Sequence, residues 1–199
     1  MRKRGLVSAT YAFRKSVGCV LQYDAKIAEE IRQAEDETDH LEDILGTYLV
    51  KLTARHIGEE ESVRATEYMK LIGDYERIAD HAVNIVESAE EMEQKKIAFS
   101  EQAAGEYQNL CAAVSEIVGM SYQAFSKNDF TAARKTEPLE QVIDDLKEEL
   151  RTRHIIRLQK GECTVDAGFV WSDLLTTLSV FPTTAPTFRD VCSTPSGTP

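Results

Sequence analysis

Glu76, Asp80 and Asn84 recur at intervals of four residues within the segment 76–84. On a helix such residues lie about 6 Å apart on one face, so their side chains form a row of oxygen atoms. The row borders an apolar stripe, where unpaired carboxylates are costly unless a cation offsets their charge. Carboxylate clusters suit magnesium, calcium, manganese or iron, with His81 as a possible nitrogen supplement. The segment therefore predicts a metal site.

A solvated charged face is the alternative interpretation of the same residues. Glu-x-x-x-Asp occurs on many exposed helices, and Arg77 could pair with either carboxylate. His81, five residues after Glu76, is typical of a surface histidine or of one that supports a ligand from behind. Spacing alone leaves both interpretations open.

Two further acidic pairs have the same spacing. Glu35 precedes Asp39 and Glu140 precedes Asp144 by four residues. Many acidic residues surround both pairs, which favours an exposed face, whereas their duplication favours a shared role as ligands. The segment 37–40 also forms an E-x-x-H pattern, but a ferritin-like di-iron site needs two such patterns and the chain has one.

Amphipathic helices carry all of these residues. Apolar side chains recur at spacings of three, four and seven, the period of a helix with one buried face. Ser100 is suited to cap a helix, and Pro138 should bend or restart one. Only the last turns of a helix are indicated before residue 24. The predicted helices span 24–53, 59–96, 100–127, 129–159 and 166–176, and with no strand-like alternation the fold class is all-α.

The chain contains an internal repeat with an offset of about 105 residues. The offset aligns Asp24 with Asp129 and places the pair at 35 and 39 onto the pair at 140 and 144. Duplicated helical units predict two similar bundles side by side. We expect the first bundle to comprise residues 1–98 and the second to comprise residues 99–177.

The repeat predicts a copy of the 76–84 motif near residue 179, but no such copy is present. Four of the five prolines fall within 178–199, so we expect a disordered Pro/Thr-rich tail there. One adenine inserted after the codon of Thr176 lets the following bases encode Glu-Arg-Val-Ser-Asp-His-Cys-Ser-Asn, which restores the motif. A frameshift is the leading hypothesis for this tail, a genuine disordered tail is the alternative, and the coding DNA would decide between them.

Charge and composition restrict the function classes. The 34 acidic and 23 basic residues give a net charge of -11, which disfavours nucleic-acid binding. The four cysteines form no C-x-x-C pair and are expected as reduced thiols, typical of the cytoplasm. No apolar run is long enough to span a membrane, so any membrane link would come through a partner or an upstream segment. No nucleophile and base are arranged as in an enzyme.

The segment Asp-Tyr-Glu-Arg-Ile-Ala-Asp-His-Ala-Val-Asn-Ile at 74–85 resembles the signature of the PhoU family. Further segments resemble the C-terminal cytoplasmic PhoU-like domain of bacterial sodium/phosphate cotransporter family proteins. They are D-x-x-E-D-x-L-G-T-Y-L-V-K-L at 39–52, V-I-D at 142–144 with R-H at 153–154, and G-E-C-T at 161–164 before F-V-W-S-D-L-L at 169–175. The resemblance covers about residues 13–176.

This resemblance implies two three-helix bundles whose Glu-x-x-x-Asp motifs bind metal clusters, and a role in restraining or sensing phosphate transport. The implied partner is the membrane domain or subunit of a phosphate transporter, at the inner face of the membrane. The implied ligands are Glu76 and Asp80 and, from the facing helices, Glu35, Asp39, Glu140 and Asp144. Asn84 and His81 are expected to contact the ligands rather than the metal itself. The sequence departs from the family because no transporter precedes the domain and the second Glu-x-x-x-Asp helix is lost after Thr176.

Three hypotheses therefore follow from the sequence. The leading one is a non-catalytic, metal-binding regulatory module that acts on a phosphate transporter. The second is a ferritin-like metal enzyme, and the third is a purely structural interaction bundle without metal. A truncated second bundle would expose apolar surface, so association between copies of the chain is also expected.

Overall fold

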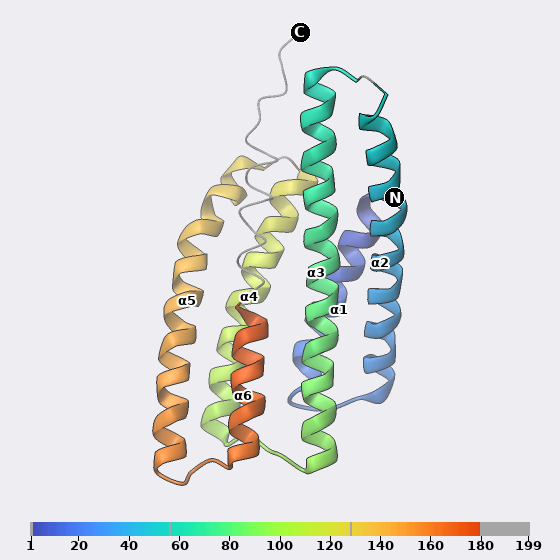
Figure 1. Cartoon of the computed structure of the whole chain (residues 1–199). Coiled ribbons are helices and arrows are strands. Elements are labelled where there is room, and N and C mark those ends of the chain that lie inside the picture. The colour runs from blue at the N-terminus through green and yellow to red at the C-terminus, as the bar shows by residue number, and fades with distance from the viewer. Residues whose placement is uncertain (1, 56, 128, 180–199) are drawn as a thin grey trace.

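The computed structural model describes residues 2–55, 57–127 and 129–179. These residues form helices joined by short connections and contain no strand, which confirms the all-α prediction. The helices are α1 Arg2–Cys19, α2 Ala25–Thr53, α3 Glu59–Lys95, α4 Glu101–Lys127, α5 Phe130–Gln159 and α6 Val165–Leu178 (Figure 1).

Polar side chains fix the start of four helices. Asp24, Ser100, Asp129 and Thr164 each accept a hydrogen bond from a backbone amide two or three residues ahead, at 2.8 to 3.2 Å. These bonds satisfy amides that have no partner within the helix. Asp24 and Asp129 begin α2 and α5, so the two positions aligned by the sequence repeat have the same structural role.

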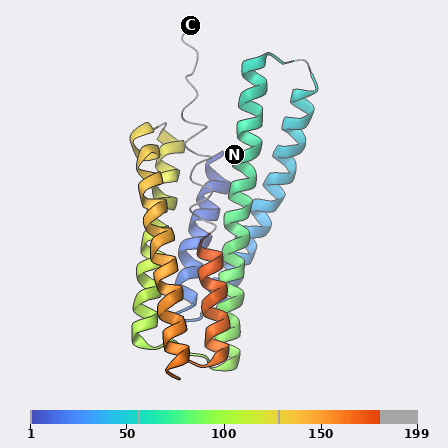
Figure 2. The same ribbon diagram turned by 60° about the vertical axis from the view of Figure 1, so that its left-hand side comes forward.

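Helices α1, α2 and α3 pack against one another as a three-helix bundle, and α4 packs along α5 (Figure 2). Helix α6 lies between α5 and α3, and α1 also contacts α4. One hydrophobic core runs through both groups of helices and includes Phe13, Ile85, Tyr107, Ile143 and Trp171. Because this core is shared, the division into domains at residue 98 stays a prediction.

The N-terminal helix is longer than the sequence indicated. We expected only its last turns, but α1 extends from Arg2 to Cys19, so that prediction is wrong. Its buried face includes the small residues Ala9, Ala12 and Ser16. Small side chains give a weak apolar pattern, although they allow neighbouring helices to approach closely.

Helix α5 runs through Pro138 without the predicted restart. Proline removes one backbone hydrogen bond, and the flanking turns maintain the helix around it. Helix α5 ends before Gly161, whose φ of 69° lies in the left-handed region that favours glycine.

The remaining sequence predictions concern membrane spans, the C-terminal tail and the cysteines. No helix in the described ranges is long and apolar enough to cross a membrane. We predicted a disordered, frameshifted tail at 178–199. Leu178 still belongs to α6, and from residue 180 onward the tail lies outside the described residues. Cys192 lies there too, and the thiols of Cys19, Cys111 and Cys163 are free.

Candidate metal site

Five carboxylates gather where α2 packs against α3. Glu35, Asp39 and Glu42 lie on successive turns of α2, and Glu76 and Asp80 lie on adjacent turns of α3. We call this group the α2–α3 acidic cluster. The structure therefore brings two predicted Glu-x-x-x-Asp pairs, Glu35 with Asp39 and Glu76 with Asp80, to the same pair of helices.

The charges of the cluster act on one another across the two helices. Burial raises the pKa of Glu76, and the nearby charges of Glu42, Asp80, Asp39 and Glu35 raise it further. Burial likewise raises the pKa of Glu35, with further contributions from Asp36, Asp39 and Asp80. Burial and repulsion together disfavour ionisation of Glu35 and Glu76, and a bound cation would offset both effects.

Basic side chains do not neutralise this repulsion. Among the described residues, no lysine or arginine forms an ion pair with a carboxylate of the cluster. Arg77, which the sequence offered as a partner, lies 3.9 Å from Asp74 instead. The negative charge of the cluster is therefore left for ions from solution.

The cluster is open to solvent on one side. Glu35, Glu42 and Glu76 are half-buried, and Asp39 and Asp80 are exposed. Glu42 reaches across to α3, because a Cβ atom at Gly73 would lie 3.5 Å from its Oε1 atom. A hydrated cation could reach these carboxylates from the solvent side and keep some of its water.

His81 and Asn84 flank the cluster and are half-buried. The Nδ2 atom of Asn84 lies 3.5 Å from Oδ2 of Asp80 and 3.5 Å from Nδ1 of His81, at the limit of hydrogen-bond distance. Burial lowers the pKa of His81, with Asp80 acting in the opposite direction. A neutral imidazole is the form that can bind a metal or orient a ligand.

The oxygen donors of the α2–α3 acidic cluster are chemically suited to a hard divalent cation, but their side chains do not converge on one point. Within the described residues, no three histidine, cysteine or acidic side chains converge closely enough to hold a metal ion. Carboxylates from two adjacent helices are nevertheless the ligands that calcium, magnesium and manganese take. Metal binding would therefore require the carboxylate side chains of the α2–α3 acidic cluster to rotate toward one another.

The other predicted ligands lie elsewhere. Glu140 and Asp144 are half-buried on α5, which packs against α4 and α6 rather than beside the α2–α3 acidic cluster. Lys147 Nζ lies 3.2 Å from Asp144 Oδ1. Under the repeat offset Lys147 occupies the position of Glu42, so the second bundle has a cation where the first has a carboxylate.

Two features of the sequence change in importance in the structure. Glu42 belongs to the cluster although it was not a predicted ligand, and its spacing of three residues from Asp39 and seven from Glu35 was the available indication. Glu37 and His40 are exposed on α2. Their E-x-x-H pattern therefore faces away from the core in which a ferritin-like di-iron site is built.

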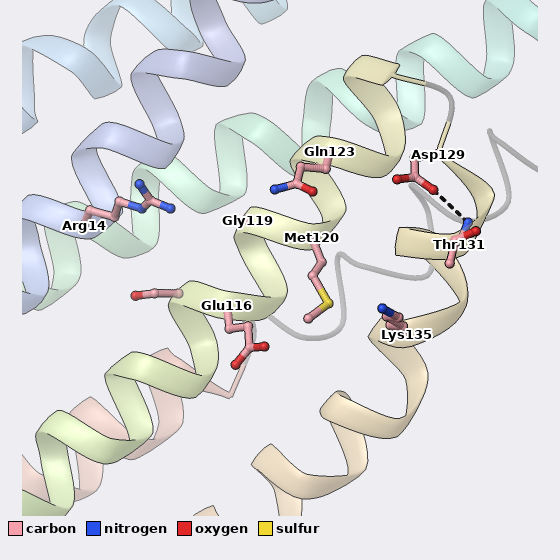
Figure 3. Close-up of a pocket in the computed structure, with 9 residues that line it drawn as sticks. Arg14, Glu116, Gly119, Met120, Gln123, Asp129, Thr131 and Lys135 are labelled. Carbon is pink, nitrogen blue, oxygen red and sulfur yellow. Dashed lines mark hydrogen bonds between the residues drawn. The ribbon is translucent and has the colours of Figure 1, made fainter.

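A pocket of about 420 Å³ lies between α4 and the start of α5, with Arg14 of α1 at its edge (Figure 3). Its charged side chains Arg14, Glu116 and Lys135 are exposed. Asp129 is occupied in capping α5 through its bond to the amide of Thr131. The pocket contains none of the predicted site residues, and its opposite charges favour no particular ligand.

The model of the PhoU domain family matches residues 8–89, a range that contains the whole α2–α3 acidic cluster. Residues 8–89 are a PhoU domain. The PhoU domain comprises most of the first bundle and ends before α4. The resemblance noted at residues 74–85 is thus confirmed for the family, whereas the resemblance to sodium/phosphate cotransporter proteins stays a prediction.

Known proteins resemble the chain well beyond the PhoU domain. It is 22% identical over 146 residues to the phosphate-specific transport system accessory protein PhoU homolog 1 of Thermotoga maritima. That match covers 73% of this chain and 62% of the relative, less than two thirds of its length.

Two solved structures share the fold. The crystal structure of PhoU from Pseudomonas aeruginosa matches 96% of this chain and 91% of its own, with a TM-score of 0.79 and 16% identity. The phosphate transport system regulatory protein PhoU from Streptococcus pneumoniae matches 96% and 89%, with a TM-score of 0.72 and 16% identity. At such identities the likeness shows the helical-bundle fold.

Proposed function

We propose that this chain is a non-catalytic regulatory module of phosphate transport whose α2–α3 acidic cluster binds a divalent cation. The observation that carries the proposal is a set of five carboxylates inside a PhoU domain that no lysine or arginine of the described residues neutralises. Two relatives are named as an accessory protein of a phosphate-specific transport system and as a phosphate transport regulatory protein.

Glu76 and Asp80 would hold the cation from α3, and Glu35, Asp39 and Glu42 would hold it from α2. A bound cation would replace the repulsion between the two helices by a shared attraction and so stabilise their packing. His81 and Asn84 would orient Asp80. Iron, manganese, magnesium and calcium all accept such oxygen ligands.

The proposed partner is a membrane domain or subunit of a phosphate transporter, contacted at the cytoplasmic face of the membrane. A sodium/phosphate cotransporter is the specific candidate that segments 39–52 and 161–175 suggest by resemblance. Glu140 and Asp144 would provide a second site only if Lys147 released Asp144.

Metal-dependent stability tests the proposal. The chain is freed of metal with a chelator, and its melting temperature is measured with magnesium, calcium, manganese or ferrous iron added. We expect a saturable increase with at least one of these ions, which is lost when Glu76→Gln is combined with Asp80→Asn. Glu140→Gln is the matched control and should retain the increase.

Two outcomes would decide for the other hypotheses. No stabilisation by any of the four ions would support a purely structural bundle. Oxygen consumption with ferrous iron would support a ferritin-like enzyme, which the exposed positions of Glu37 and His40 oppose.

A further inference from the structure

Helices α4 and α6 begin, and α5 ends, at the same end of the molecule (Figure 1). A small, partly open cavity lies there. Its volume is about 120 Å³. A water molecule takes up about 30 Å³ in the liquid, so the cavity has room for more than one water molecule. Its lining includes Ser100 from before α4, Thr164 from before α6, His154 and Arg157 from α5, and Trp171 from α6.

Three nitrogen atoms of these lining residues have no hydrogen-bond partner within residues 2–55, 57–127 and 129–179. They are Nε2 of His154, Nη2 of Arg157 and Nε1 of Trp171, and each is buried. His154 is 7% exposed, the side chain of Arg157 is 7% exposed and Trp171 is 1% exposed. Buried polar groups in native proteins are almost always paired, and an unpaired donor costs about 1–3 kcal/mol. Nη2 of Arg157 and Nε1 of Trp171 can only donate, and Nε2 of His154 donates in one of its two neutral tautomers, so an occupant that accepts hydrogen bonds would satisfy them.

Arg157 is the buried cation of the cavity wall, and Glu106 accepts from only part of its guanidinium group. Nη1 of Arg157 donates to Glu106 at 2.6 Å, and Nη1 of Arg153 donates to the same carboxylate at 3.2 Å. Two guanidinium groups thus share one buried carboxylate, and Arg153 has a second partner in the exposed Glu149. Glu162 also lines the cavity but is exposed, where solvent screens its charge.

Two helix ends add positive potential at the cavity. Ser100 and Thr164 cap α4 and α6, so the positive ends of both helix dipoles lie at the cavity wall. Helix ends alone do not make a site, but here they coincide with the three buried nitrogen atoms.

The aromatic packing holds these nitrogen atoms in place. The rings of His154 and Trp171 are stacked with their centroids 5.9 Å apart, and Cζ of Arg157 lies 5.3 Å from the Trp171 ring centre. Phe99 packs edge-on against the indole at 5.2 Å. A Cβ atom at Gly168 would lie 3.1 Å from Nε2 of His154, so a larger residue there would crowd the imidazole.

We propose that this cavity binds a small oxyanion the size of inorganic phosphate or sulfate, held by hydrogen bonds from Arg157, Trp171 and His154. Arg157 would donate through Nη2, which does not bond to Glu106. The site lies outside the α2–α3 acidic cluster, so it goes beyond the proposed function and does not require a metal.

Trp171 is the only tryptophan of the chain, so its fluorescence reports on the cavity directly. The full chain, with metal chelated, is titrated with inorganic phosphate and with sulfate, and sodium chloride at matched ionic strength is the control salt. We expect a saturable fluorescence change with phosphate, sulfate or both, and none with chloride. Calorimetry should show the same affinity.

Arg157→Lys tests the assignment, because lysine keeps a cation beside Glu106 but loses the second guanidinium nitrogen. We expect about tenfold weaker oxyanion binding, since a hydrogen bond to a charged group is worth about that factor. The control replaces Arg14 and Lys135 by glutamine in the pocket of Figure 3 and should leave the affinity unchanged. If Arg157→Lys fails to fold by circular dichroism, His154→Leu takes its place, with the same expectation.

Three results would each overturn the oxyanion site: an equal response to chloride, no response to either oxyanion, or weaker binding only in the Arg14 and Lys135 variant. The metal experiment fails separately. If no metal raises the melting temperature but the oxyanion still binds, only the proposed function is refuted. If a metal raises the melting temperature but no oxyanion binds, only this inference is refuted.

Discussion

Glu106 is a buried acid on which the second group of helices depends. Its side chain is 6% exposed and accepts hydrogen bonds from Arg157, Arg153 and Gln102. The charge of Arg157 is equally buried, at 7% exposure. Removing one partner of such a pair leaves the other as an uncompensated charge in a poorly solvated place.

We expect Glu106→Ala to lower the free energy of unfolding by about 3–5 kcal/mol, the typical cost of breaking a buried ion pair. Urea denaturation measures this loss. Glu149→Ala removes the exposed partner of Arg153 and should cost less than about 1 kcal/mol. Equal losses in the two variants would contradict the central position of Glu106.

Glu76 should make stability depend on pH in a defined direction. Burial and the neighbouring carboxylates raise its pKa in the folded chain. The folded state therefore binds protons more strongly than the unfolded state, so this contribution to stability is lost as pH rises from about 4.5 through the raised pKa. Without metal, Glu76→Gln should therefore stabilise the chain more at pH 7 than at pH 4.5.

Urea titrations at both pH values measure this difference, with Glu87→Gln as the control at an exposed position of the same helix. If Glu76→Gln had the same effect at both pH values, the coupling within the acidic cluster would be refuted.

At the scale of the helix, Thr164 is the cap on which α6 depends most. The helix has only 14 residues, and Oγ1 of Thr164 accepts a bond from the amide of Ala167 at 3.2 Å. Thr164→Ala should cost about 1 kcal/mol of unfolding free energy, and Thr164→Ser should cost much less. Thermal unfolding compares the two, and equal melting temperatures would show that the cap contributes nothing.

Helix boundaries could be predicted where polar caps and a strong apolar period coincide. Asp24, Ser100 and the acidic residues after Gly58 mark helix starts in sequence and in structure. The first turns of α1 could not be predicted, because Ala9 and Ala12 contribute little to an apolar pattern although both are fully buried.

The acidic cluster was predictable only as separate pairs. The spacing of Glu76 and Asp80, or of Glu35 and Asp39, fixes the helix face on which each pair lies, but it does not say which faces meet. The pairing of Glu106 with Arg157 joins residues 51 positions apart on different helices. No local pattern contains such a contact, so the oxyanion cavity could not be predicted from the sequence.

At the scale of the whole molecule, the frameshift hypothesis makes a prediction about stability. A chain whose residues after Thr176 follow the restored frame would carry a second Glu-x-x-x-Asp-His-x-x-Asn motif on a longer last helix. That helix should cover apolar surface of the second bundle, so its melting temperature should exceed that of the present chain. Circular dichroism of both chains measures the difference, and an unchanged value would count against the two-bundle architecture.

Helix α3 connects both ends of the molecule as a single rod. Its 37 residues extend over about 55 Å, and it contacts α1, α2 and α6. Glu76 and Asp80 lie near its middle, and the connection after its last residue, Lys95, forms part of the oxyanion cavity wall. A tilt of about 5° around that end would move the tip at Glu59 by about 5 Å, so α3 has the dimensions of a lever that turns small changes near its base into large displacements at its tip.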